Sequence, residues 1–221
     1  MATRISFLTN DGVEIVGTFE RPPKATSAAL CLHMMPADRT SWLGLQEGLA
    51  ARNVASLAID LRGHGESISK GGARIDYRRF TEQEHQASQE DVSGALAWLE
   101  AQGFSKDRVA VVGGSIGANL ALRAAASHSL LTVCLLSPGE NYRGVTTYDA
   151  ARNLKNPQAL LVVASEDDAE SYDDSERIME LAQIADKRFI SFPHAGHATG
   201  MFISQPELLK ELADWIAERL A

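Results

Sequence analysis

Short hydrophobic runs alternate with longer amphipathic segments over most of the chain. The runs are rich in Val, Leu, Ile and Ala, which is typical of strands buried on both faces of a sheet. They lie at residues 28–33, 54–59, 109–112, 132–136, 159–164 and 188–191. The segments with helical spacing lie at 42–52, 82–101, 116–126, 175–185 and 206–220. This alternation predicts an α/β fold, with a mostly parallel sheet and helices on both of its faces.

The N-terminal residues follow a different pattern. Residues 5–8 and 13–19 have the composition of strands, and Asn10, Asp11 and Gly12 between them form a strong turn signal. We therefore expect an N-terminal antiparallel hairpin at the edge of the sheet. No repeat or linker interrupts the rest of the sequence, so residues 1–221 are expected to form a single domain.

Charge and composition narrow the classes of function. The formal net charge of −8 argues against nucleic acid as a partner, because neutralising phosphates needs a basic surface. The sequence shows neither an apolar signal region nor a run of about 20 apolar residues, which predicts a cytoplasmic protein without a membrane partner. Cys31 and Cys134 lie within hydrophobic runs, where we expect buried free thiols. The oligomeric state stays open.

The segment at residues 108–120 gives the strongest chemical signal. A hydrophobic strand leads into the pattern G-x-S-x-G at residues 113–117, and an alanine-rich helix follows. Small neighbours permit a sharp strand-to-helix turn, which projects the serine hydroxyl from the carboxyl end of the sheet. The helix N-terminus beside it favours developing negative charge. Ser115 is therefore the candidate nucleophile.

A serine nucleophile needs a base, and the base needs an acid that orients it. His197 follows the last predicted strand and a pair of small residues that give the backbone room to turn, so we prefer it to His194 as the base. Carboxylates at Asp167 and Asp168 follow the preceding strand. Further acidic residues up to position 176 lack the spacing of a calcium loop and are interpreted as a solvated loop.

Five segments in the same order resemble the motifs of the α/β-hydrolases. They lie at residues 32–36, 60–67, 113–117, 164–168 and 195–197. Over nearly its full length the chain is most similar to compact serine esterases and dienelactone-hydrolase-like members. The resemblance implies an α/β-hydrolase fold without a cap domain. It also selects Asp167 as the acid, because the family's acid falls three positions after the glycine that closes the strand, a place held here by Ala164. A shift of one residue would select Asp168.

The resemblance also assigns the oxyanion donors to the backbone N–H groups of Ile116 and Met35. Met34 stands where the family usually has glycine, and its side chain is expected either to narrow the acyl site or to alter this turn. A further polar set is expected to tie loops together through hydrogen bonds and a salt bridge around the active face. It comprises His33, Asp60, Arg62 and His64. His85 and His128 are interpreted as surface residues.

Together these features imply a serine hydrolase that cleaves a small carboxylic ester or thioester through an acyl-enzyme. No metal or organic cofactor is expected, and the partner is a small-molecule acyl substrate. Two alternatives stay open: a cofactor-free perhydrolase or C–C bond hydrolase on the same three residues, and a non-catalytic ligand-binding homologue. Residues 138–157, where larger members insert a lid, hold about one short helix at ~1.5 Å per residue, which predicts an open site for short acyl groups.

Overall fold

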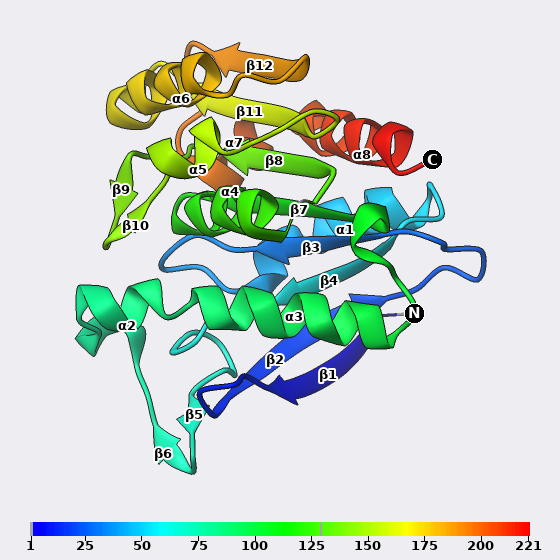
Figure 1. Cartoon of the computed structure of the whole chain (residues 1–221), viewed down its shortest axis with the longest axis vertical. Coiled ribbons are helices and arrows are strands. Elements are labelled where there is room, and N and C mark those ends of the chain that lie inside the picture. Colours follow the sequence, from blue (N-terminus) through cyan, green and yellow to red (C-terminus); the bar gives the residue numbers. More distant parts are fainter. Residues whose placement is uncertain (1, 129) are drawn as a thin grey trace.

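The computed structural model describes residues 2–128 and 130–221 and contains the predicted alternation of strands and helices (Figure 1). The strands are β1 (Thr3–Leu8), β2 (Val13–Glu20), β3 (Ala28–Leu32), β4 (Ala55–Ile59), β5 (Ser69–Lys70), β6 (Ala73–Arg74), β7 (Val109–Gly114), β8 (Thr132–Leu136), β9 (Asn141–Tyr142), β10 (Val145–Thr146), β11 (Ala159–Ser165) and β12 (Asp186–Phe192). The α-helices are α1 (Leu43–Ala50), α2 (Glu82–Gln86), α3 (Gln89–Ala101), α4 (Ile116–His128), α5 (Tyr148–Arg152), α6 (Ala169–Leu181), α7 (Met201–Ser204) and α8 (Glu207–Arg219). Short 3₁₀ turns cover Arg39–Trp42, Tyr77–Arg79, Lys106–Arg108 and Ala198–Gly200.

The main sheet has the order β12-β11-β8-β7-β3-β4-β2-β5-β6, and β1 pairs with β2. Strands β4, β3, β7, β8, β11 and β12 are parallel to their neighbours in this series, whereas β1 and β2 form the predicted antiparallel hairpin. From β3 the chain first extends the sheet on one side through β4 and later returns to the other side through β7. The carboxyl ends of β3 and β7 therefore meet at a topological switch point, where ligands bind in open α/β sheets.

Each central strand divides its side chains between two hydrophobic layers. Helices α3, α4, α5 and α6 cover one face of the sheet, and α1 and α8 cover the other (Figure 1). In β3, Leu30 and Leu32 belong to the first layer, while Ala29 and Cys31 belong to the second. This alternation explains why the parallel strands are hydrophobic throughout. Cys31 and Cys134 are buried free thiols, as predicted.

Several elements differ from the sequence prediction. Helix α6 begins at Ala169, ahead of the predicted start at residue 175, so the acidic residues expected to form a solvated loop lie instead on this helix. Among them, Asp174 accepts hydrogen bonds from the N–H of Glu140 and the hydroxyl of Tyr148. The predicted helix at 82–101 is divided into α2 and α3. His85, expected at the surface, is only 6% exposed because the ring of Phe80 packs against it. No helix in the described part of the chain is long and apolar enough to cross a bilayer.

Candidate active site

Ser115 occupies the turn between β7 and α4 in a left-handed conformation, with φ of 55°. Its N–H donates to the carbonyl of Leu136 over 2.9 Å, which fixes the turn to the end of β8. The crowding inferred from the sequence is real. A Cβ atom added to Gly117 would lie 2.3 Å from the carbonyl oxygen of Leu32, and one added to Gly113 would lie 2.1 Å from that of Gly117. Only glycine at both positions lets the backbone close so tightly around the serine.

The imidazole of His197 contacts Asp168, which corrects the sequence assignment of Asp167. The distance from His197 Nδ1 to Asp168 Oδ2 is 2.6 Å. Asp167 instead accepts hydrogen bonds from the hydroxyl of Ser165 and from the N–H of Gly196. The Ser165 hydroxyl is the main reason that the pKa of Asp167 lies below its usual value. Asp167 thus stabilises the turn that presents the histidine but does not contact its ring.

The physical reason for this correction is the length of β11. The strand continues to Ser165, one residue beyond the predicted end at Ala164. Counting three positions from Ser165 leads to Asp168, the alternative that the sequence had left open.

The turn that carries His197 packs directly against the serine turn. The N–H of Ala198 donates to Ser137 Oγ over 2.9 Å, and a Cβ atom added to Gly114 would lie 3.1 Å from the Cβ of Ala198. The ring of Tyr142 meets that of His197 edge-on, with centroids 6.3 Å apart. Ser115 is 9% exposed. Among the described residues no hydrogen bond joins its hydroxyl to His197, which is common for catalytic pairs before substrate binds.

His33 orients the turn that holds Met35. The N–H of Leu61 donates to His33 Nε2 over 2.9 Å, so the ring proton lies on Nδ1, which donates to the carbonyl of Met34 over 2.8 Å. Burial lowers the pKa of His33 to about 4, so the ring is neutral at pH 7. The C=O of Met34 and the N–H of Met35 belong to one trans peptide and point in opposite directions. His33 therefore turns the Met35 N–H away from itself, and this N–H donates to no acceptor within the described residues.

The two predicted oxyanion donors lie at the carboxyl ends of neighbouring strands. Met35 follows β3, and Ile116 follows β7 as the first residue of α4, where a backbone N–H has no intrahelical acceptor. Met34 packs toward the layer of α1 and α8, while Met35 packs toward the opposite layer. Trp42 is fully buried against Phe202 and belongs to the core.

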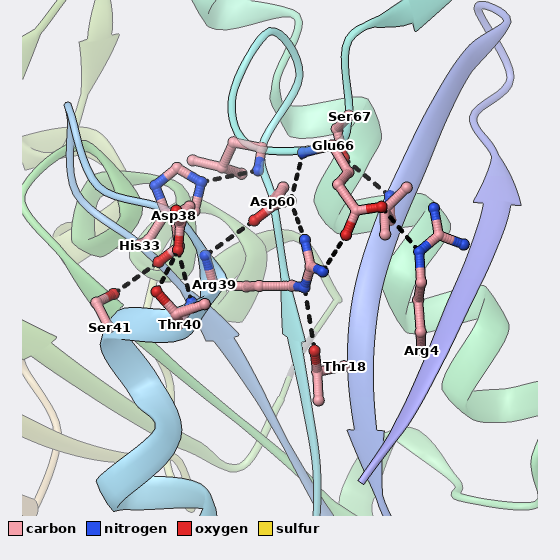
Figure 2. Close-up of polar contacts among 12 residues, drawn as sticks. Arg4, Thr18, His33, Asp38, Arg39, Thr40, Ser41, Asp60, Glu66 and Ser67 are labelled. Atoms are coloured by element: carbon pink, nitrogen blue, oxygen red, sulfur yellow. Dashed lines mark hydrogen bonds and ion pairs between the residues drawn. The ribbon is translucent and has the colours of Figure 1, made fainter.

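Asp60, directly after β4, connects the segment around Arg39 to the loop that contains Glu66 (Figure 2). Its carboxylate accepts the N–H of Arg39 over 2.9 Å and that of Glu66 over 2.8 Å, and it also pairs with the guanidinium of Arg39. That guanidinium reaches Glu66 and Thr18 as well. The sequence predicted a loop-tying role for Asp60, and the contacts confirm it. Arg39 was missed because no local pattern indicates a partner from another loop.

Arg62 and His64 also hold loops, as predicted. The buried guanidinium of Arg62 binds Asp91 of α3 through its Nε at 2.8 Å and Asp11 of the first turn through its Nη1 at 2.8 Å. His64 stacks on Tyr77 with ring centroids 3.7 Å apart. No group of three or more His, Cys, Asp or Glu side chains in the described residues is arranged to hold a metal ion.

Comparisons with known proteins agree with this architecture. The family model described as "Alpha/beta hydrolase family" matches residues 29–154, more than half of the chain. No curated protein matches the chain in sequence. An esterase of Pyrococcus furiosus is similar over 100% of this chain and 93% of its own, with 15% identity and a TM-score of 0.82. A dienelactone hydrolase of Anabaena variabilis is similar over 99% and 95%, with 21% identity and a TM-score of 0.74. The esterase domain of a Rhodothermus marinus protein covers 100% of both chains, with 16% identity and a TM-score of 0.74. These likenesses confirm the predicted fold.

Proposed function

The chain belongs to the α/β-hydrolase family, and we propose that it is a serine hydrolase that cleaves small carboxylic esters or thioesters. The observation that supports this most strongly is the left-handed Ser115 between a strand and a helix, packed against the turn that carries the His197–Asp168 pair. A strained non-glycine residue persists only where surrounding structure enforces it, and such residues concentrate at functional sites.

In the proposed mechanism the carboxylate of Asp168 accepts a hydrogen bond from the Nδ1–H of His197, which keeps the proton on Nδ1 and leaves Nε2 free as a proton acceptor. Nε2 removes the hydroxyl proton as Ser115 Oγ attacks the substrate carbonyl. The N–H groups of Ile116 and Met35 stabilise the oxyanion that forms, an effect of about 3 kcal/mol per donor in comparable sites. The protonated His197 then gives its proton to the leaving alcohol or thiol, and the acyl-enzyme remains.

Hydrolysis of the acyl-enzyme repeats these steps with water. His197 removes a proton from the water as its oxygen attacks the acyl carbon. The second tetrahedral intermediate collapses, the acid leaves, and the proton returns to Ser115.

The segment between β8 and β11 supports a preference for short acyl groups. It contains only the β9–β10 hairpin and the five-residue helix α5. A lid or cap domain that shields a long acyl chain needs more chain than this. We expect kcat/KM to fall from butyryl to palmitoyl esters.

The direct test is Ser115→Ala, assayed with p-nitrophenyl acetate and butyrate. Loss of the nucleophile should lower kcat by at least about 10³-fold, because triad serines act as a unit with their base. Ser93→Ala, a hydroxyl deletion on α3, is the matched control and should keep wild-type turnover. A fluorophosphonate probe should label the wild type and the control but not Ser115→Ala. Wild-type turnover by Ser115→Ala would refute the proposed function.

A further inference from the structure

A cavity of about 470 Å³ opens beside the turn that carries the proposed oxyanion donor. Its lining residues are Met35 from the turn after β3, Tyr77 and Arg78 from the 3₁₀ turn after β6, His85 from α2, and Arg143 from the β9–β10 hairpin. The residue before Arg143 is Tyr142, whose ring meets that of His197. The cavity thus shares Met35 with the proposed oxyanion site, and Arg143 is the sequence neighbour of a residue that contacts His197.

Arg143 stands at a backbone position that favours other residues. It forms, with Gly144, the two-residue loop between β9 and β10, and the two have φ of 54° and 82°. Two positive φ values define a type I′ turn, whose first position prefers Asn, Asp or Gly. An arginine is disfavoured there, so its presence indicates that its side chain has a use.

The hairpin that presents Arg143 is firmly anchored. Asn119 of α4 donates to the carbonyl of Val145 over 2.7 Å and accepts the N–H of Gly139 over 3.0 Å. The side chain of Asn141 accepts the N–H of Gly144 over 2.7 Å. Because Asn119 lies one helical turn after Ser115, the hairpin and the nucleophile are held by the same helix.

Two arginine side chains, Arg143 and Arg78, line the cavity. Arg143 forms no ion pair with any described residue. Arg78 lies 3.7 Å from the carboxylate of Asp76 and 5.4 Å from the ring centroid of Tyr77, and its side chain is 73% exposed. Burial, followed by the nearby charge of Arg143, lowers the pKa of His85, so its ring is neutral at pH 7. On a chain with a net charge of −8, two guanidinium groups that line the same cavity are a local exception.

We propose that Arg143, together with Arg78, forms an anion subsite that selects esters whose acyl part ends in a carboxylate or phosphonate group. This rests on the proposed function for the identity of the reaction, while the anion binding itself does not depend on it. Guanidinium groups match the planar oxygens of such anions and bind them through charge-assisted hydrogen bonds. The subsite lies toward β9–β10 and α2, and the ester lies at Ser115.

The test compares monoethyl glutarate with ethyl pentanoate, which has similar length and no charge, by ethanol release. We expect kcat/KM to be at least about tenfold higher for the anionic ester and this preference to shrink with added salt, since screening weakens exposed charges. Ethyl 3-phosphonopropionate in place of the glutarate distinguishes a phosphonate preference from a carboxylate preference.

The decisive variant is Arg143→Asn, because asparagine suits the left-handed turn while the guanidinium group is removed. The ratio of the two kcat/KM values should fall about tenfold in Arg143→Asn. It should not change in Arg152→Ala, a control that removes an exposed arginine from α5. An unchanged ratio in Arg143→Asn, or equal kcat/KM for both esters in the wild type, would overturn the anion subsite.

A binding measurement separates this subsite from the proposed reaction. Calorimetry with Ser115→Ala should detect monoethyl glutarate and not ethyl pentanoate, and adding Arg143→Asn should abolish the signal. Equal binding of both esters would refute the subsite whether or not the protein hydrolyses them. Conversely, selective binding of the anion by a protein that turns over no ester would support the subsite and contradict the proposed function.

Discussion

At the scale of single residues, the neighbouring carboxylates of Asp167 and Asp168 contact different groups. Asp168 contacts the imidazole of His197, whereas Asp167 accepts hydrogen bonds from Ser165 and Gly196 at the base of the same turn. Asp168 is therefore placed to fix the tautomer of His197. Asp167 fixes the backbone of the turn that carries His197.

Asp168→Asn should therefore lower kcat far more than Asp167→Asn. An amide at position 168 presents an N–H to Nδ1 and favours the wrong tautomer, a change that costs about 10⁴-fold in a comparable triad. Asp167→Asn keeps an oxygen for Ser165 and Gly196, so we expect a loss of less than about tenfold. Steady-state kinetics with p-nitrophenyl butyrate measure both. A larger loss in Asp167→Asn would restore the assignment made from sequence.

The sequence identified the place of Ser115 but not the partner of His197, and the reason is physical. Close backbone contacts within the serine turn and with β3 leave room only for glycine at positions 113 and 117. The local sequence pattern around Ser115 is therefore enough to predict the turn. The acid depends on where β11 ends. Neither Ala164 nor Ser165 has a feature that stops a strand, so only the pairing of β11 with β12, which continues to Ser165, decides the register.

At the scale of elements, the junction of β7 and α4 is built from close backbone contact. Gly117 lies against the carbonyls of Leu32 and His33 at the end of β3. Any side chain there forces β3 and α4 apart, and the turn that carries Met35 moves with β3.

Gly117→Ala is thus expected to destabilise the protein by several kcal/mol, in the range of severe overpacking. Gly200 offers a matched control, since it is helical with φ of −60° and no atom lies within 4 Å of a Cβ added there. Gly200→Ala should be neutral or stabilise the protein by about 0.4–1 kcal/mol. Urea unfolding of both variants checks this. Equal stability of the two would show that the elbow relaxes around the added methyl group.

The same logic explains which elements the sequence predicted. The parallel strands are hydrophobic on both faces, so their positions follow from composition alone. The β9–β10 hairpin was not predicted, because each strand has two residues and Arg143 occupies the turn position where Asn or Gly would give a signal. The start of α6 was not predicted, because the acidic residues of its first turns were interpreted as a solvated loop.

At the scale of the whole molecule, buried polar groups lock together the loops at the carboxyl edge of the sheet. Asp60 joins the segments around Arg39 and Glu66, and Arg62 joins the first turn to α3 through Asp11 and Asp91. His33 and His64 lie between these two networks with ring centroids 4.9 Å apart. Burial lowers the pKa of both rings to about 4, so both are neutral in the folded protein at pH 7.

Because both rings stay neutral in the folded protein, we expect the free energy of unfolding to decrease as the pH is lowered. Burial is the main cause that lowers the pKa of His64 from 6.5 to about 4. As pH falls through 6.5, the unfolded chain takes up a proton at this ring while the folded protein does not until about pH 4. The free energy of unfolding therefore decreases across this window by about 1.4 kcal/mol per pH unit for the ring. His33 acts in the same direction.

His64→Gln isolates this contribution, because glutamine does not titrate. Asp91 acts in the opposite sense, since burial raises its pKa to about 6, but it is present in both proteins and cancels in their comparison. Urea unfolding at several values between pH 7 and pH 4.5 should give a slope of free energy against pH that is shallower in the variant by about 1.4 kcal/mol per unit. A constant offset from the lost stacking on Tyr77 does not change this slope. Parallel lines for wild type and variant would mean that His64 takes up its proton equally well in the folded protein, and that its burial does not keep the ring neutral.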